Sequence, residues 1–244
     1  MDSGFYASCA GLRAQSQALE VAAHNLANLS TNGFRSQQPS FQSLLAATHP
    51  VPNVLNLAIN NYGVLEGTHL DRSAGNLQAT GNPLDLGIEG VGFFAIQTQQ
   101  GTRYTRNGSF RVARTGQLAT AAGDPVLGEN GTPIPVPAGS VSVSSDGTIS
   151  VNSAIAGKLR LVEFPPDTRL VSEGDLLLRA PDGAAQAAKQ TTVRQGTLES
   201  SNVNPIAAVM TVIGVQRNAE MMQRALSMFF SEFNRIAAND VPRV

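Results

Sequence analysis

The sequence predicts an α+β protein with a long helix at each end of the chain and an antiparallel all-β domain inserted between them. Two observations carry this prediction: apolar residues recur every seven positions near both termini, and alternating, glycine-rich sequence fills the middle. The two helices are expected to pair in a coiled-coil-like stalk. The predicted organisation is an N-terminal helix and its end (1–34), an extended connector with room for one hairpin (35–75), the β domain (76–197) and a C-terminal helix (198–244).

The composition excludes several classes of protein. The 244 residues are 42% hydrophobic and carry a net charge of −1, so the chain can build a core but lacks the basic excess of a nucleic-acid-binding surface. No run of about 18 apolar residues predicts a membrane helix, and the start lacks the pattern of a cleavable secretory signal. The single Cys9 cannot form an internal disulfide, and His24, His49 and His69 lack metal-ligand spacing. No metal or cofactor is expected.

The N-terminal helix is predicted from a heptad of apolar residues that no proline interrupts. Its members are Phe5, Leu12, Leu19 and Leu26. Gly33, after the polar residues 30–32, can adopt the left-handed conformation that commonly ends helices. The helix is therefore expected to end just before this glycine.

The C-terminal helix is predicted to begin at Pro205, because proline suits the first helical turn and Asn204 before it is a good N-cap. Apolar residues then follow spacings of four and three, as in a coiled-coil seam. The seam residues are Ala208, Val212, Val215, Ala219, Met222, Leu226, Phe229, Phe233 and Ile236. A second apolar row of Ile206, Val209, Met210 and Ile213 predicts that further helices are contacted there.

The middle of the chain predicts short antiparallel strands, because apolar and polar residues alternate and turn pairs such as Asn107-Gly108 and Asp146-Gly147 separate them. Short strands joined by turns favour a barrel or a sandwich. The predicted strands are 84–88, 92–97, 103–105, 109–113, 117–120, 141–143, 148–151, 158–164 and 175–179.

This order of elements predicts assembly. Two helices bury one seam only, and isolated helices gain most of their stability by packing an apolar face, so neighbouring molecules are needed to complete the core. A contact that joins different patches of successive copies does not close on itself and produces a tube or filament. The predicted assembly interface comprises Phe5, Leu12, Leu19, Leu26, Ile206, Val209, Ile213, Met222, Leu226, Phe229, Phe233 and Ile236.

Candidate catalytic groups are weak. Gly87, Gly90 and Gly92 follow a predicted strand, but their spacing is not the dinucleotide-binding fingerprint. Asp167, Glu173 and Asp175 lie near one another in a predicted surface turn, with spacing that fits no calcium loop. We therefore expect neither enzymatic activity nor a small-molecule substrate.

Five segments resemble the bacterial flagellar rod and hook proteins, and the resemblance covers nearly the whole chain. Residues 10–14 (AGLRA) and 25–35 (NLANLSTNGFR) are similar to the family signature S-G-L-x-A followed by N-N-L-A-N-x-x-T-x-G-F-[KR], and residues 193–204 (VRQGTLESSNVN) resemble V-x-x-G-x-L-E-x-S-N-V-N. Residues 84–94 (LDLGIEGVGFF) and 104–110 (YTRNGSF) resemble two motifs of the β domain. The matching motif residues are Asn25, Leu26, Asn28, Thr31, Gly33, Phe34, Gly196, Leu198, Glu199, Ser201, Asn202, Val203 and Asn204.

The resemblance implies a structural subunit of the flagellar basal-body rod, with the terminal helices forming an inner tube and the β domain outside it. It implies rod and hook-family proteins and copies of the chain itself as partners, a periplasmic location, and export by the flagellar type III apparatus without a cleaved signal. The start of the chain and residues 220–223 look more like the proximal than the distal rod members. Two departures from the pattern are Cys9, where serine or threonine is usual, and Ala219, where the family has an aromatic ring.

Alternatives stay open at this point. The chain could be a distal rod member or, in another class, a surface adhesin or carbohydrate-binding module that residues 76–197 would form on a helical stalk. A hydrolase that uses the loop carboxylates of Asp167 and Asp175 is a third hypothesis.

Overall fold

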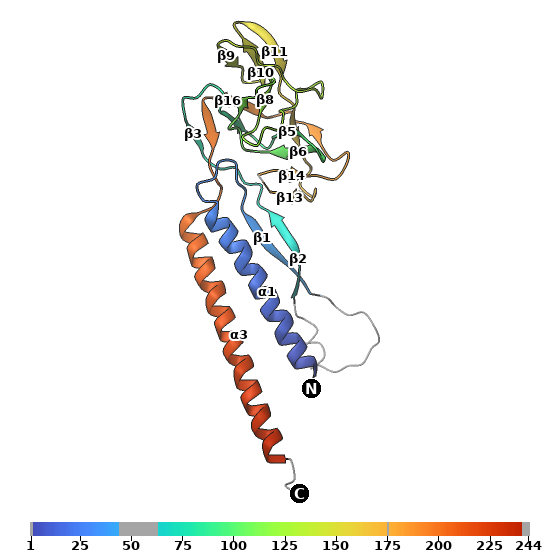
Figure 1. Ribbon diagram of the computed structural model, residues 1–244, viewed down its shortest axis with the longest axis vertical. Helices are drawn as coiled ribbons and strands as arrows, with labels where there is room; N and C mark the ends of the chain where they lie inside the picture. The colour runs from blue at the N-terminus through green and yellow to red at the C-terminus, as the bar shows by residue number, and fades with distance from the viewer. Residues whose placement is uncertain (1, 44–62, 175, 241–244) are drawn as a thin grey trace. The chain divides into compact units, whose positions relative to one another are not determined.

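The computed structural model describes residues 2–43, 63–174 and 176–240, which form two compact units (Figure 1). Unit 1 comprises residues 1–27, 37–69 and 204–244, and unit 2 comprises residues 28–36 and 70–203. The described residues contain two helices, α1 (Asp2–Ala27) and α3 (Pro205–Asp240), and seventeen strands. Within these residues, neither helix combines the length and apolarity needed to cross a membrane.

The predicted fold class is wrong. The described part of the chain consists mostly of strands and has only two helices. These helices do not form the long coiled-coil pair that the predicted α+β fold requires. Among the described seam side chains of α3, only Ala208 is buried, whereas Val212, Val215, Ala219, Met222 and Leu226 are partly exposed. Heptad spacing shows that one face of a helix is apolar, but a coiled coil also needs large interlocking side chains. Here small residues lie at the contact, including Gly11, where an added Cβ would lie 3.2 Å from the sulfur of Met222.

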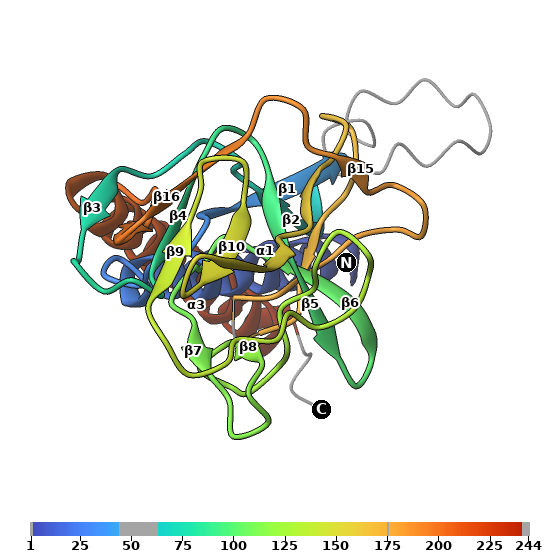
Figure 2. The same ribbon diagram turned by 90° about the horizontal axis from the view of Figure 1, so that it is seen from above.

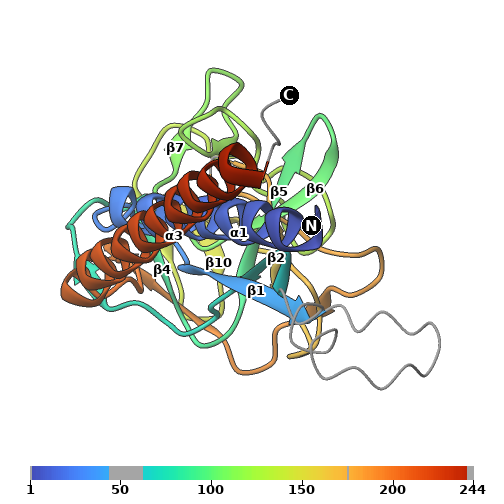
Figure 3. The ribbon, with the colours of Figure 1, turned by 90° about the horizontal axis from the view of Figure 1, so that it is seen from below.

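Unit 1 places α1 and α3 side by side, with β1 (Gln37–Ser43) along α1 (Figures 1 and 3). The Gln15 side chain donates from Nε2 to the carbonyl of Val215 at 2.8 Å, and Ala18 and Ala22 are buried. The Asn204 Oδ1 atom accepts hydrogen bonds from the amides of Ile206 and Ala207, at 3.0 and 3.1 Å, as an N-cap should. The strand β2 (Gly63–Leu70) pairs with β1.

Unit 2 contains the remaining strands, and the sheets whose register is resolved are antiparallel. The largest is a six-stranded sheet in the order β13 (Val171–Ser172), β14 (Leu178–Arg179), β6 (Gly101–Thr105), β5 (Phe93–Thr98), β12 (Leu161–Glu163) and β15 (Gln186–Ala187). A three-stranded sheet has the order β11 (Ala154–Lys158), β10 (Thr148–Val151) and β9 (Val141–Val143). Two-stranded sheets join β16 (Thr192–Gln195) to β4 (Leu86–Glu89), β17 (Thr197–Glu199) to β3 (Leu77–Ala79), and β7 (Arg111–Val112) to β8 (Leu118–Ala119). Figure 2 shows β5 and β6 side by side, and likewise β9 and β10.

The strand β5 explains why unit 2 has two hydrophobic clusters. Successive side chains of a strand point to opposite faces. Phe94 and Ile96 lie in the larger cluster, whereas Phe93 and Ala95 lie in the second one. Phe94 meets Phe110 edge to face, with ring centroids 5.0 Å apart. All four residues of Phe93–Ile96 are apolar, and they alternate between the two clusters. Strand β5 therefore lies at the centre of unit 2.

Each of the nine predicted strands overlaps an observed one, so these predictions are confirmed. The sequence missed strands of two or three residues such as β13 and β15, because so short a segment shows no periodicity. It also missed β16 and β17, which are separated by Gly196 at φ +69°. The paired strands β1 and β2 lie in residues 35–75, for which the sequence predicts an extended connector with room for one hairpin. Residues 44–62 of this connector lie outside the described part.

Replacing Phe94 by alanine should reduce the free energy of unfolding by roughly 3–5 kcal/mol, because the ring is fully buried in the larger hydrophobic cluster. Denaturant unfolding of the full chain, followed by tyrosine fluorescence, measures this. Val91→Ala is the matched control, since Val91 is 64% exposed and should change the stability little. Equal effects of the two substitutions would contradict the assignment of β5 as the core strand.

Candidate functional site

Residues 28–35 and 193–203 are the parts of the first and last motif segments that belong to unit 2. They lie side by side, although more than 150 residues separate them in the chain. The amide of Gly33 donates to the carbonyl of Glu199 at 2.7 Å, and the amide of Asn202 donates to the carbonyl of Phe34 at 3.4 Å. The Phe34 and Leu198 side chains are both buried. The segment that follows α1 is therefore bonded to the segment that precedes α3.

Gly33 is required here for two reasons. Its φ is +72°, a conformation that residues with a Cβ rarely adopt. An added Cβ would also lie 2.3 Å from the backbone nitrogen of Asn107, which is too close for any side chain. The glycine thus ends the first motif and lets the backbone pass against residues 106–107.

The Glu199 carboxylate is the centre of the site. Its side chain is only 1% exposed, and it pairs with two buried arginines: Oε1 lies 2.7 Å from Arg35 Nη2, and Oε2 lies 3.1 Å from Arg106 Nη1. The amide of Gly75 also donates to Oε1, at 2.8 Å. A buried charge is tolerated only when it is paired and hydrogen-bonded, so this carboxylate holds three separate segments together.

Arg106 connects the cluster to the β core. Its Nη2 atom donates to the carbonyl of Gly90 at 2.6 Å, and its guanidinium lies over the Phe93 ring, 5.0 Å from the centroid. Burial lowers the pKa of Arg106 to about 10, because desolvation disfavours the charged form; Glu199 opposes this shift and Arg35 adds to it. The arginine nevertheless stays charged at neutral pH.

A second carboxylate offsets the remaining positive charge. Burial raises the pKa of Asp71. Hydrogen bonds from Ser73 and Ser36, together with the positive charge of Arg35, lower it by a larger amount, so the pKa lies below its ordinary value. Among the described residues, Arg35 Nε and Nη1 and Arg106 Nε have no hydrogen-bond partner. The cluster therefore contains two arginines and two carboxylates, of which Glu199 is the one bonded to both arginines.

Asn202 is the second hub of the site. Its Oδ1 atom accepts from the amide of Ser36 at 2.7 Å. Its Nδ2 atom donates to the carbonyl of Asp71 at 3.2 Å and to the carbonyl and hydroxyl of Ser73, both at 3.1 Å. One amide side chain thus cross-links the segments around residues 36, 71–73 and 202.

The other polar motif residues make local bonds. In unit 1, Asn25 Oδ1 accepts from the amide of Gln37 at 2.9 Å while Nδ2 donates to the carbonyl of the same residue at 2.7 Å. The Thr31 hydroxyl donates to Asn28 Oδ1 at 3.1 Å, and Ser201 Oγ accepts from the amide of Val203. The motif is thus a set of structural connections.

Arg106, Asp71 and Gly75 belong to the site but were not among the residues singled out from the sequence. Arg106 lies in the YTRNGSF motif, and an arginine directly after the alternating pattern of a buried strand is the only sequence signal that marks it. Asp71 and Gly75 lie in irregular sequence with no pattern.

The predicted assembly residues divide into three groups. Ile206, Val209 and Ile213 of α3 are exposed. Leu12, Leu19, Leu26, Met222 and Leu226 are partly buried within unit 1. The side chains of Phe5, Phe229, Phe233 and Ile236 lie outside the described set.

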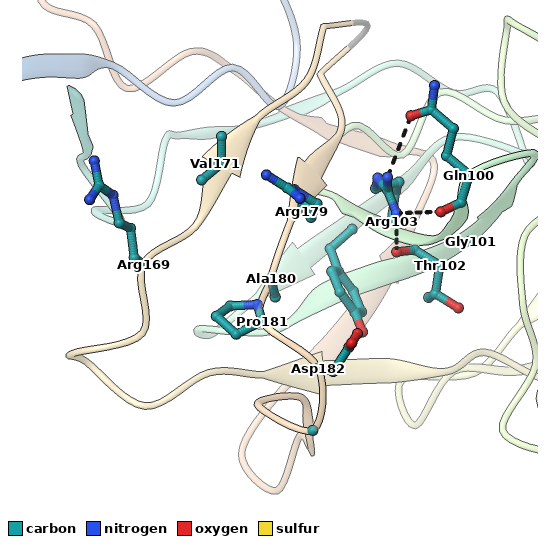
Figure 4. A pocket seen from close by; sticks show the side chains of 12 residues that line it. Gln100, Gly101, Thr102, Arg103, Arg169, Val171, Arg179, Ala180, Pro181 and Asp182 are labelled. Carbon is teal, nitrogen blue, oxygen red and sulfur yellow. Dashed lines mark hydrogen bonds between the residues drawn. The ribbon is translucent and has the colours of Figure 1, made fainter. Parts of the chain in front are cut away.

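A polar hollow of about 660 Å³ in unit 2 lies beside β13 and β14 (Figure 4). Glu173, one of the loop carboxylates noted in the sequence, pairs with Arg103 at 2.5 Å and with Arg179 at 2.7 Å. Asp167 is exposed, and Asp175 lies outside the described residues. In the described part of the chain no group of histidine, cysteine and acidic residues could hold a metal ion.

Comparisons with known proteins agree with the sequence motifs. A family model described as "Flagella basal body rod protein" matches residues 5–35, and one described as "Flagellar hook protein FlgE/F/G D1 domain" matches residues 87–151. The flagellar basal-body rod protein FlgF of Salmonella typhimurium is 36% identical, over 93% of this chain and 94% of that protein. The chain belongs to the flagellar basal-body rod protein family. FlgF of Escherichia coli K12 is 35% identical over 93% and 94%, and the rod protein FlgG of Bacillus subtilis is 30% identical over 91% and 93% of the two chains.

Membership of this family decides several alternatives. The chain is a structural subunit of the flagellar basal-body rod and not an enzyme. The order predicted from the sequence, proximal (FlgF) type before distal (FlgG) type, is confirmed by the identities. The adhesin and hydrolase hypotheses are left without support.

Glu199→Gln should destabilise unit 2 by roughly 3–5 kcal/mol, because it leaves two arginines buried without their shared carboxylate. The midpoint of denaturant unfolding of the full chain, followed by the circular dichroism signal of the β-strands, measures the loss of stability. Glu129→Gln is the matched control: Glu129 is exposed and lies 3.6 Å from an exposed Lys158, so it should cost less than about 1 kcal/mol. Similar costs for both variants would mean that Glu199 does not hold the site.

Gly33→Ala should cost more than the roughly 1 kcal/mol of an ordinary left-handed glycine, since the added methyl also collides with the backbone at Asn107. Gly116→Ala provides the comparison, because Gly116 has a nearly equal φ of +73° and open space around it. The difference between the two losses of stability, measured by thermal unfolding, isolates the steric part. A difference near zero would show that residues 33 and 107 are not in contact.

Proposed function

We propose that this rod subunit polymerises through α1 and α3, with copies of itself and with other proteins of the rod and hook family, into the drive shaft that transmits torque. Assembly with rod and hook-family components follows from the family. The use of the terminal helices is the step that the proposal adds. Its main support is the exposed apolar surface of α3.

The exposed apolar side chains of α3 form one stripe. Met210, Met221 and Met228 are each about 60% exposed. At ~100° per residue they lie within about 20° of one another around the helix, with Ile206 and Ile213 about 40–60° to one side. The partly buried side chains of α3, which include Val212 and Ala219, lie on the opposite side. The exposed Arg217 and Arg224 lie within about 40° of Met210 on the same side, so the stripe is apolar over the first turns of α3 and also carries positive charge farther along. Exposed apolar side chains grouped in this way mark a protein–protein contact.

The stripe cannot be covered by the same stripe of one partner if a rod is to grow. Closed contacts between identical patches end at a dimer, whereas contacts between different patches of successive subunits continue as a helical filament. A rod subunit requires the second kind. We therefore infer that the stripe on α3 contacts a different surface of the next subunit.

The low stability expected of the isolated terminal helices supports export through the flagellar type III apparatus, without a cleaved signal, to the periplasmic part of the rod. Helices that bury a single narrow face gain little stability alone. Terminal segments that become fully ordered only on assembly could pass a narrow channel unfolded and then order at the growing end.

Ile213→Asp should abolish rod assembly while leaving the soluble chain folded, because residue 213 is exposed in the monomer but would bury an unpaired carboxylate in the assembled contact. Swimming of cells that carry only the variant, together with electron microscopy of their basal bodies, measures assembly. The control is Gln216→Glu, an acidic change at an exposed polar position of α3 outside the stripe. Normal motility of the Ile213→Asp cells would overturn the proposed interface.

A further inference from the structure

The chain passes between unit 1 and unit 2 four times, after residues 27, 36, 69 and 203. Unit 2 therefore has four chain ends, at residues 28, 36, 70 and 203. In the rod, any force that passes along the chain between the terminal helices and the β strands has to pass through these four connections. How unit 2 holds its own chain ends therefore matters for a protein that carries load.

Three of the four ends lie within one residue of Asn202 or of its hydrogen-bond partners. Asn202 is adjacent to the end at Val203 and bonds to the end at Ser36 through Oδ1. It bonds to the end at Leu70 through the carbonyl of Asp71. A direct backbone bond from the Asp71 amide to the Ser36 carbonyl, 2.9 Å long, closes the set.

The fourth end, at Asn28, is held through the same cluster. The Thr31 amide donates to the Asn28 carbonyl at 3.2 Å, and the Gly33 amide two residues later donates to Glu199. Glu199 in turn pairs with Arg106, which follows β6 and rests on Phe93 of β5. All four ends are thus connected to the central strand of the unit through the hydrogen bonds of Asn202 and the buried ion pairs of Glu199.

We propose that Asn202 and Glu199 form a load-bearing anchor, through which unit 2 holds all four chain ends as one group. The anchor consists of Gly33, Arg35, Ser36, Asp71, Ser73, Arg106, Glu199 and Asn202, all of which belong to unit 2. Without the anchor, each chain end could detach from unit 2 independently of the others, by breaking one hydrogen bond after another. The load-bearing role rests on the proposed function as a rod subunit, whereas the cooperative holding of the ends does not.

Gln195 provides a matched comparison because it is a similar hub away from the chain ends. Its Nε2 atom donates to the carbonyls of Pro83 and Val141, at 2.8 and 3.0 Å, and its Oε1 atom accepts from the amide of Val143 at 3.1 Å. Gln195→Ala thus removes three bonds to other segments of unit 2, whereas Asn202→Ala removes four. The two variants differ in whether those segments are chain ends.

Hydrogen exchange of the full soluble chain tests the anchor without requiring assembly. In Asn202→Ala the amides of Gly33 and Asp71 should exchange at least about tenfold faster, although neither is bonded to the side chain of Asn202. The Ala95 amide in β5 should keep its protection, and Gln195→Ala should accelerate Val143 but neither Gly33 nor Asp71. Faster exchange at Ser36 alone would show a local bond and overturn the anchor. If Asn202→Ala also opens β5, the milder Ser73→Ala decides by the same amides.

Swimming in media of increasing viscosity tests the load. Cells with the Asn202→Ala subunit should swim normally in dilute medium and lose speed or shed filaments as viscosity rises, while Gln195→Ala cells follow the wild type. Equal behaviour of the two variants under load, together with the expected exchange pattern, would overturn the load-bearing role and leave the cooperative anchor standing. Loss of rods in both variants would also count against a role specific to the chain ends.

Discussion

The structure of unit 2 depends on one buried carboxylate shared between two buried arginines. Glu199 lies just ahead of α3, Arg35 lies in the segment that follows α1, and Arg106 follows the central hairpin of the β sheet. None of these charges could be buried alone, so each segment is stable in its place only when the others are present. Segments from three distant parts of the sequence are in this way made to fold together.

This arrangement gives a physical meaning to the family motifs. Gly33 lets the chain pass against Asn107, Glu199 gathers the arginines, Asn202 binds the adjoining backbones, and Asn204 caps α3. These residues perform no chemistry. They determine where the chain leaves the β unit and enters the helices, which is the property that a polymerising subunit has to keep constant.

The sequence predicts the parts of the fold that periodicity controls. The run at Phe93–Ile96 identifies the central strand, and Asn204 with Pro205 locates the start of α3, because each signal is local. The prediction of the fold class is wrong because heptad spacing indicates an apolar face but does not show that this face is buried. At the contact between the helices, Gly11 and alanines leave the seam partly exposed. Arg106 and Asp71 could not be assigned, since pairing between distant charges leaves no mark in local sequence.

The central claim is that the ion pair between Glu199 and Arg35 joins the segment that precedes α3 to the segment that follows α1. A double-mutant cycle measures this most directly. Arg35→Met, Glu199→Gln and the double variant are compared by denaturant unfolding of the full chain. A coupling free energy above about 2 kcal/mol is the result that the account predicts, because the two groups are buried and 2.7 Å apart. Additive losses, agreeing within about 0.5 kcal/mol, would contradict it.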